Sequence, residues 1–474
     1  MTSPSTNQEG HEVKKRKFEV PHIYLLLFAI AAICALASWI MPAGTFDRAA
    51  NSAGKMLVVP GTYHKVASTP VTLFQLFGSI YKGLVDAGDI IFFIFISYSS
   101  INLIISSGVL NGLVSKLLKR IRGKYRTIII PIFLLIIGIT SSTIGIFEEM
   151  YPFIPIFAGI TIAMGYDAIV GTAIVALATS IGFSCAVMNP FNVGMAQSIA
   201  GVAQLSGSGF RIFSHVVMIA VASVYIIRYA LQVEVDPSKS AVYGVSFDHL
   251  GVDKDAVMNQ SFGLREKLVL LTLASGIVVI IWGCSAKGWY FQEICTVFFI
   301  MGIVSSIIMG WSANTICKKI EKSISEIAMA ALVVGVARSI LIVLNEGNIM
   351  DTIIYALSIP LLHLPKWIAG EAMLLFQTVL NFLIPSSSGM AVVSMPIMAP
   401  LADILHISRQ VAVLAFQYGD GLSNVLWPTA STPIICAVAG IPMQKWIKWF
   451  IPLFLLLLLT EGILIAISIA IGYV

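Results

Sequence analysis

The sequence predicts an all-α polytopic membrane protein made of two repeats of opposite orientation. Of its 474 residues, 58% are hydrophobic and 11% are charged, whereas about 25% of the residues in a soluble domain are charged. Apolar stretches long enough to cross a hydrocarbon core of about 30 Å recur along the chain. Polar breaks interrupt them at matching positions in the two halves. These observations predict about ten transmembrane helices, two re-entrant hairpins and two broken helices.

The first apolar segment sets the orientation. Residues 1–21 are predicted to be a cytoplasmic tail, because they include the basic run "KKRK" (14–17) and basic residues favour the cytoplasmic side. The run 22–41 is longer than the core of a signal peptide, and the "MPAGTF" at its end is a poor cleavage site. We therefore expect a retained first helix with a cytoplasmic N-terminus.

Later basic clusters orient the rest of the chain in the same way, and they lie at 116–126, 228–267, 317–322 and 444–448. Full spans are predicted at 88–106, 210–232, 266–285, 289–311, 326–346 and 449–471. Amphipathic segments are expected along the membrane interfaces, at 70–87, 109–121, 312–325 and 349–362.

Two segments are predicted to enter the membrane and return on the same side. In residues 127–163, only about 13 residues precede the polar "TSSTIG" (140–145), so this arm climbs about 20 Å at helical rise. A re-entrant hairpin from the cytoplasm fits this length better than two full spans. A second hairpin, 366–402, has "PSSSG" at its tip and is expected to enter from outside. Gly389 at this tip is expected to have a positive φ, which glycine adopts without strain.

Two further helices are predicted to be broken, at "MNPFN" in 167–201 and at "SNVLWPTAST" in 409–440. The halves align at a nearly constant offset: Gly108 with Gly347, Pro190 with Pro428, and Gly201 with Gly440. The first repeat is therefore 22–232, residues 233–288 are a cytoplasmic loop and linking span, and the second repeat is 289–474. Inverted repeats of this kind bind substrate at the midplane, between broken helices. The alternative is that Pro and Ser only kink buried helices.

Ionisable residues inside the membrane are costly, so each is a candidate for function. Glu148 and Glu149 follow the first hairpin tip, Asp420 precedes the second helix break, and Arg338 lies deep in its span. Arg338 could instead neutralise one of the acids as a structural pair, and Glu148 could be tied to basic residues at the hairpin base. Neutral groups suited to bind substrate are Asn189, Asn192, Ser386, Ser387, Ser388, Ser423, Asn424, Thr429 and Ser431. Trp427 could stack on a cation or serve packing. Structural or gating roles are expected for Thr140, Ser141, Ser142, Arg338 and Gly389.

A surplus of acid in the membrane favours a cationic substrate such as arginine, ornithine or lysine, whose α-carboxylate could lie on the N-termini of half-helices. The competing interpretation is a dicarboxylate or other organic anion, with Glu149 and Asp420 carrying protons or binding sodium. An enzyme is not expected, because the HExxH, GxSxG and P-loop patterns are absent. The cysteines show no CxxC spacing, so no metal or cofactor is expected beyond a coupling sodium or proton, and no nucleic-acid partner.

Four sequence blocks resemble a known family: "GIFEEMYPFIPIF", "MNPFNVGMAQSIAG", "PSSSGMAVVSMPIMAPLAD" and "GDGLSNVLWPTAST". They are similar to the YfcC-like carriers of the DcuC-like (four-carbon dicarboxylate anaerobic carrier) family, within the ion-transporter superfamily. The resemblance implies a bacterial inner-membrane antiporter, usually a homodimer, with a scaffold domain and a transport domain that moves as an elevator. This branch resembles basic amino-acid and arginine/ornithine exchangers, while more distant relatives carry dicarboxylates.

Overall fold

The computed structural model describes residues 22–50, 56–109, 123–247, 250 and 263–474. Within them, eight helices are long and apolar enough to cross a membrane. They are α1 (Ile23–Ile40), α3 (Gly88–Ser106), α5 (Ile129–Ile144, counted from Arg126), α9 (Ser208–Val235), α12 (Phe291–Ile308), α13 (Ala313–Glu346), α16 (Ser387–Ile404) and α19 (Met443–Ala470). The predicted multi-pass helical class is confirmed. The expected ten spans exceed this count partly because the broken helices are too short to reach spanning length.

Each predicted hairpin range contains a helix, a break and a second helix. In the first, α5 ends at Gly145, which has a left-handed φ of 83°, and a 3₁₀ turn (η2, Glu148–Phe153) leads into α6 (Ile154–Ala163). In the second, α15 (Lys366–Leu383) is separated from α16 by residues 384–386. The first break therefore follows "TSST", whose residues form the last turn of α5. Re-entry from one side of the membrane stays a prediction.

The two broken helices have closely similar parts. α7 (Ala168–Ser184) and α8 (Val193–Ala200) flank the first break, and α17 (Arg409–Ser423) and α18 (Thr432–Ala439) flank the second. Both short halves have 8 residues and end at a left-handed glycine, Gly201 with φ 65° and Gly440 with φ 68°. These glycines are one of the pairs that the repeat alignment matches. Gly108 has φ 77°, but its predicted counterpart Gly347 is right-handed, and the positive φ falls on Asn348 instead.

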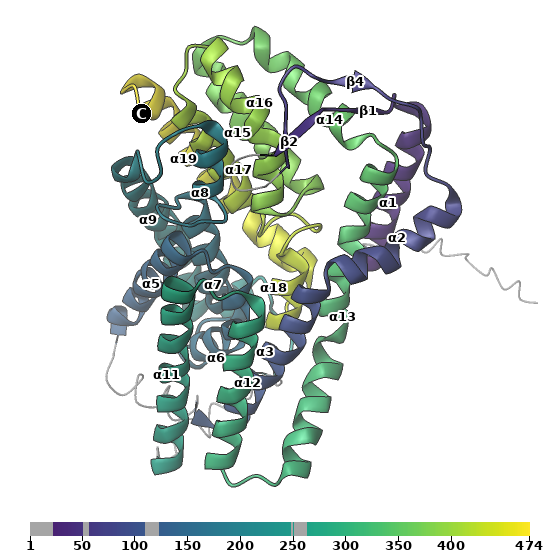
Figure 1. The fold of residues 1–474 in the computed structure, drawn as a ribbon. Coiled ribbons are helices and arrows are strands. Elements are labelled where there is room, and N and C mark those ends of the chain that lie inside the picture. The colour runs from purple at the N-terminus through teal and green to yellow at the C-terminus, as the bar shows by residue number, and fades with distance from the viewer. Residues whose placement is uncertain (1–21, 51–55, 110–122, 248–249, 251–262) are drawn as a thin grey trace, which may run out of the picture.

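The packing of these helices also repeats. α5 packs on α7, and α15 packs on α17 in the same way. The second helix of each hairpin contacts the short half of the other broken helix: α6 contacts α18, and α16 contacts α8. α7 and α17 meet in the centre, and α9 contacts α19. Every residue of α7 and every residue of α17 except Arg409 is buried, so this pair forms the core of the helical unit in Figure 1. The opposite orientation of the two halves stays a prediction.

A second group of helices lies beside this unit. α13 packs against α1, α2 (Leu73–Asp86) and α3, and α12 packs against α3 and α11 (Leu264–Lys287). α2 crosses α13 closely, because a Cβ atom added at Gly83 would lie 2.3 Å from the carbonyl oxygen of Gly335. Figure 1 shows α11, α12 and α13 extending together at one end of the molecule.

Three sequence expectations need correction or fall outside the described residues. The segment 312–325 is no separate interfacial helix, because α13 runs unbroken over 34 residues from Ala313 to Glu346. The tail 1–21 and nearly all of 109–121 lie outside the described residues. The fold is also not purely α-helical, since short strands pair between α1 and α2: β1 (Gly44–Thr45) with β4 (His64–Lys65), and β2 (Arg48–Ala50) with β3 (Met56–Val58).

The remaining short elements connect these groups. They are η1 (Gly123–Ile128), η3 (Pro237–Lys239), α14 (Met350–Ser358) and η5 (Ile359–His363). In Figure 1 the strands and α14 lie at the end of the molecule opposite the tips of α11 and α12. β3 packs on α16, so the strand segment touches the second hairpin.

Candidate substrate site

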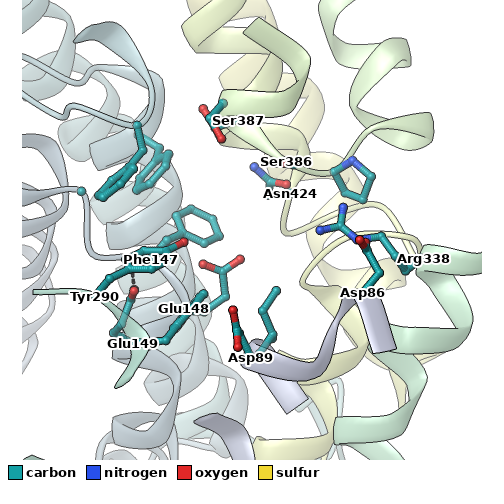
Figure 2. A pocket seen from close by; sticks show the side chains of 17 residues that line it. Asp86, Asp89, Phe147, Glu148, Glu149, Tyr290, Arg338, Ser386, Ser387 and Asn424 are labelled. Carbon is teal, nitrogen blue, oxygen red and sulfur yellow. Dashed lines mark hydrogen bonds and ion pairs between the residues drawn. The ribbon is translucent and has the colours of Figure 1, made fainter. Parts of the chain in front are cut away.

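A cavity of about 200 Å³ lies where the hairpin and helix breaks meet the ends of α2, α3 and α12 and the middle of α13. Figure 2 shows the side chains that line it. Its polar lining consists of Asp86, Asp89, Glu148, Glu149, Tyr290, Arg338, Ser386, Ser387, Ser388 and Asn424. Its apolar lining includes Ile90, Phe147, Phe183, Phe191, Phe291 and Pro385. The cavity therefore lies between the unit of hairpins and broken helices and the second helix group.

The lining carries four carboxylates and one guanidinium. Arg338 Nε and Asp86 Oδ2 form an ion pair of 2.6 Å, so one acid is neutralised by the one base. In Figure 2 this pair lies across the cavity from Glu149 and Tyr290. Among the described residues, Asp89, Glu148 and Glu149 have no ion-pair partner. The cavity is therefore acidic.

Glu148 and Glu149 are neighbours in the sequence but differ in what their carboxylates contact. Glu149 is 4% exposed, and its Oε2 accepts a 2.8 Å hydrogen bond from the backbone N–H of Phe147. This bond closes the turn at the start of η2. Glu148 is only partly buried, and Figure 2 shows its carboxylate directed into the cavity. Glu148 is thus the acid of this pair that can meet a ligand directly.

The opposite wall is the N-terminus of α16. The Ser386 hydroxyl caps this helix by accepting from the backbone N–H of Gly389, and the first-turn residues Ser387 and Ser388 line the cavity. The first N–H groups of an α-helix have no partner within it and favour anions, as does the helix dipole. The cavity therefore has an acidic wall and a wall that favours negative charge.

Asp420 lies behind this wall and is fully buried. Its Oδ2 accepts a 2.7 Å hydrogen bond from Asn192 Nδ2, which also donates to Ser387 Oγ at 2.9 Å. Asn424 donates to the backbone carbonyl of Asp420 at 2.8 Å. These bonds join the first helix break, the second helix break and the second hairpin. Asp420 and Asn192 therefore position the site and do not line it.

Hydrogen bonds fix the second break to α15, and they involve Asn381 together with several residues that the sequence predicted. Asn381 Nδ2 donates to the Asp420 carbonyl, to Ser423 Oγ at 2.7 Å and to Asn424 Oδ1 at 3.1 Å. Trp427 Nε1 donates to the carbonyl of Thr378 and Thr429 Oγ1 to that of Phe382, while the Ser431 N–H donates to the Asn424 carbonyl. Trp427, Thr429, Ser423 and Ser431 thus hold the backbone in place, and Trp427 does not stack on the cavity.

The first break is tied to α5 in the same manner. The carbonyl of Ser142 accepts from the N–H groups of Val187, Met188 and Asn189, and Ser141 Oγ donates to the Thr179 carbonyl. Asn189 Oδ1 accepts from the next backbone N–H groups, of Phe191 and Asn192. Thr140 Oγ1 donates within its own helix. These residues shape the break that carries Phe191 to the cavity wall.

The expected positive φ at Gly389 is wrong, because this residue lies in the first turn of α16 and is not among the glycines with positive φ. A Cβ atom there would lie 3.2 Å from Ser386 Oγ and 3.3 Å from Ser386 Cβ. What favours glycine is thus the close fit against the capping serine, and not the backbone conformation.

Several important residues were not predicted from the sequence. Asp86 is the last residue of α2, and Asp89 lies in the first turn of α3. Acids are ordinary at a predicted membrane boundary, so the sequence did not mark these two as site residues. Tyr290 and Phe147 are ordinary in their apolar surroundings. Asn381 did offer a signal, because it is an amide within the apolar arm that precedes "PSSSG". Among the described residues, no group of three or more His, Cys, Asp or Glu side chains could hold a metal ion.

The chain matches the family model described as "C4-dicarboxylate anaerobic carrier" (DcuC) over residues 20–470. It is 30% identical over 498 aligned positions to the Escherichia coli (strain K12) protein named "Putative basic amino acid antiporter YfcC", covering 97% of this chain and 98% of that protein. It is 29% identical to a Haemophilus influenzae protein named "Uncharacterized protein", covering 96% and 98%.

Two solved structures are similar at lower levels. One is the Alcanivorax borkumensis YdaH transporter, with a TM-score of 0.46 and 16% identity, covering 96% of this chain and 99% of that chain. The other is Neisseria gonorrhoeae MtrF, with a TM-score of 0.45 and 16% identity, covering 96% of each chain. The match to the family model extends over nearly the whole chain, including both hairpins and both broken helices. The chain therefore belongs to the C4-dicarboxylate anaerobic carrier (DcuC) family of membrane transporters.

Proposed function

We propose that this transporter is an antiporter of basic amino acids such as arginine and ornithine. The observation that carries the proposal is the charge of the cavity: four carboxylates and one guanidinium line it, and the guanidinium is already paired with Asp86. An anion would have to lie beside Asp89 and Glu148 without a compensating cation. A basic amino acid instead brings the positive charge that these acids lack.

The two walls fit the two ends of such a substrate. The side-chain cation would lie between Glu148 and Asp89, where a guanidinium can form bidentate, charge-assisted hydrogen bonds. The α-carboxylate would lie on the first turn of α16, near the N–H groups and hydroxyls of Ser387 and Ser388. Ring faces such as Tyr290 and Phe191 are available for cation–π contact with the guanidinium.

The working cycle is part of the proposal. The cavity lies between the unit of hairpins and broken helices and the group formed by α2, α3, α12 and α13. Movement of the first as a transport domain against the second as a scaffold would carry the substrate across the membrane, as in an elevator. We propose that the protein works in the bacterial inner membrane, as a homodimer with a cytoplasmic N-terminus, in line with the family resemblance and the basic residues of the tail.

A second candidate is a sodium- or proton-coupled carrier of dicarboxylates or other organic anions. The observation that favours it is the wall formed by the N-terminus of α16 with its serines. In that case Glu149 and Asp420 would serve the coupling ion, and Arg338 would have to leave Asp86 to meet the substrate.

Thermal melting of the purified protein separates the two candidates. A ligand that binds the folded state at 100 times its Kd stabilises it by about 2.7 kcal/mol, so arginine, ornithine or lysine is expected to raise Tm while succinate and fumarate leave it unchanged. Counterflow in proteoliposomes should then exchange internal ornithine for labelled external arginine. Stabilisation and exchange by a dicarboxylate, with none by the three basic amino acids, would overturn the proposal.

A further inference from the structure

Another buried acid lies outside the substrate cavity, in the second half of α19. Glu461 has 0% of its surface exposed, and neither of its carboxylate oxygens has a hydrogen-bond partner among the described residues. It faces the core of the unit, because α19 packs against α9, α15, α17 and α18. A buried carboxylate without a partner is among the most costly groups in a protein interior, so its presence asks for a function.

The polar groups around Glu461 are uncharged hydroxyl and thiol groups. The Ser184 hydroxyl at the end of α7 interacts with the carboxylate, although no hydrogen bond of normal geometry joins them, and the Tyr418 hydroxyl on α17 lies within electrostatic reach of it. The Cys185 thiol lies within the same reach. Three helices therefore bring buried polar side chains to one region of the core.

The cation that could neutralise Glu461 is occupied elsewhere. Arg211 on α9 is fully buried, but its guanidinium donates to Gln417 Oε1 at 2.7 Å, to Gln410 Oε1 at 2.7 Å and to the Ser206 carbonyl at 2.6 Å. No carboxylate among the described residues accepts from it.

The other cations on the helices packed against α19 lie elsewhere. Arg228 on α9 is exposed, Arg409 at the start of α17 pairs with Asp403, and Lys366 is the first residue of α15.

The other buried or partly buried titratable groups on these helices are not cations that meet Glu461. His215 on α9 faces Gly138 of α5, and Cys436 on α18 is a buried thiol. Glu371 on α15 is an acid that lies against Gly462. In this conformation, therefore, no cation of the described part of the chain pairs with Glu461.

We propose that Glu461 is a proton-binding site that couples transport to the proton gradient. A bound proton makes the side chain neutral, which removes the cost of burying its charge. Release of the proton requires the surroundings of Glu461 to change, by admitting water or bringing Arg211 to it. The conformation that buries Glu461 therefore binds the proton more tightly than one that exposes it. Such a difference in proton affinity between two conformations is what couples proton binding to transport.

Packing contacts connect the surroundings of Glu461 to the substrate site. Ser184 packs directly on Gly421, since a Cβ atom there would lie 2.3 Å from the Ser184 backbone nitrogen. Gly421 follows Asp420, which holds Asn192 and, through it, the α16 wall. If deprotonation of Glu461 shifts the end of α7, the shift would be transmitted through Gly421 to Asp420 and Asn192, which position the cavity wall.

Two measurements test this assignment, and the first needs no substrate. Infrared spectra of wild-type protein and of Glu461→Gln at neutral pH should differ by the C=O stretch of a protonated carboxylic acid, and the variant should melt at or above the wild-type temperature. Glutamine has the shape and neutral charge of the protonated side chain, so folding should not suffer. A difference confined to carboxylate bands would show that Glu461 is ionised and would overturn the proposal.

The second measurement is transport in sodium-free proteoliposomes, with arginine, or with succinate if melting selects a dicarboxylate. This inference rests on the proposed transport activity but not on the substrate class. The assignment of Glu461 can therefore fail while the proposed substrate holds, and the reverse is also true. A pH gradient should stimulate net uptake by the wild type and by the control Glu371→Gln. The same pH gradient should not stimulate uptake by Glu461→Gln. Substrate exchange by this variant should persist when the pH is equal on both sides of the membrane. Gradient-stimulated uptake by Glu461→Gln at the wild-type level, or wild-type uptake that does not respond to the pH gradient, would refute it.

Discussion

Replacing Glu148 by glutamine removes one negative charge from the substrate cavity while the shape of the side chain is kept. Glu148 is the acid beside the first hairpin that faces the cavity, and no ion pair neutralises it among the described residues. The proposed contact with a substrate cation is a charge-assisted hydrogen bond, and Glu148 is only partly buried. We therefore use the value for hydrogen bonds to charged groups, about 1.5–3 kcal/mol, and not the larger one for fully buried ion pairs.

This free energy corresponds to a rise in the Kd for arginine of about 10- to 150-fold. The assay is equilibrium binding of labelled arginine to purified protein, together with arginine/ornithine counterflow in proteoliposomes. The melting temperature without ligand should change little, because the amide can still form hydrogen bonds where the carboxylate did.

Glu149→Gln is the matched control, since it makes the same chemical change one residue away. Its amide oxygen can still accept from the N–H of Phe147, toward which the Glu149 carboxylate is directed although it also lines the cavity. We expect a smaller rise in Kd for Glu149→Gln than for Glu148→Gln. If Glu148→Gln binds arginine as tightly as wild type while Glu149→Gln does not, the assignment of the two acids is wrong.

Three further predictions follow from contacts near the cavity. Asp420→Asn places an amide against the Asn192 donor that now binds a carboxylate, so transport and Tm should both fall; a variant with wild-type transport would exclude Asp420 from positioning the site. Arg338→Gln leaves Asp86 without its ion-pair partner, so protein yield and Tm should fall. The double variant with Asp86→Asn should recover both. Additive losses in a double-mutant cycle would contradict the pairing. Gly389→Val crowds the α16 cap and should impair counterflow more than expression, while Gly389→Ala should be milder; equal transport by wild type and valine variant would remove this turn from the mechanism.

The helix breaks could be predicted because the signals are local. "PSSSG" and "MNPFN" lie where an apolar helix would otherwise continue, and the structure ends α15 at Leu383 and α7 at Ser184, next to these motifs. The matched glycines Gly201 and Gly440 end short helices in the same left-handed conformation. A residue that must leave the helical conformation is visible in the sequence, since few side chains tolerate it.

The lining of the cavity could be predicted only in part, because it depends on which elements meet. Glu148 and the serines of α16 were predicted from their place at hairpin tips, and both line the cavity. Asp420 was predicted from its depth and its position before the second helix break, yet it turns toward Asn192 and away from the cavity. Asp86 and Asp89 come from the junction of α2 and α3, whose approach to the hairpins is a tertiary contact. Depth in the membrane identifies a costly group, but not the direction of its side chain.

The two repeats share an architecture and contribute unlike chemistry to the cavity. After its first helix, the first hairpin presents the acids Glu148 and Glu149 on a 3₁₀ turn, whereas the second hairpin presents Ser386 and the open N-terminus of α16. Two acidic tips would repel any anionic group, and two helix N-termini would repel any cation. An acidic tip opposite a helix N-terminus instead forms a site with two poles, one wall that attracts a cation and one that attracts an anion. Both walls belong to the same cavity of about 200 Å³. A zwitterion with an additional cation satisfies both poles, while a dicarboxylate satisfies one. The difference between the hairpins, and not their similarity, therefore favours the basic amino acid.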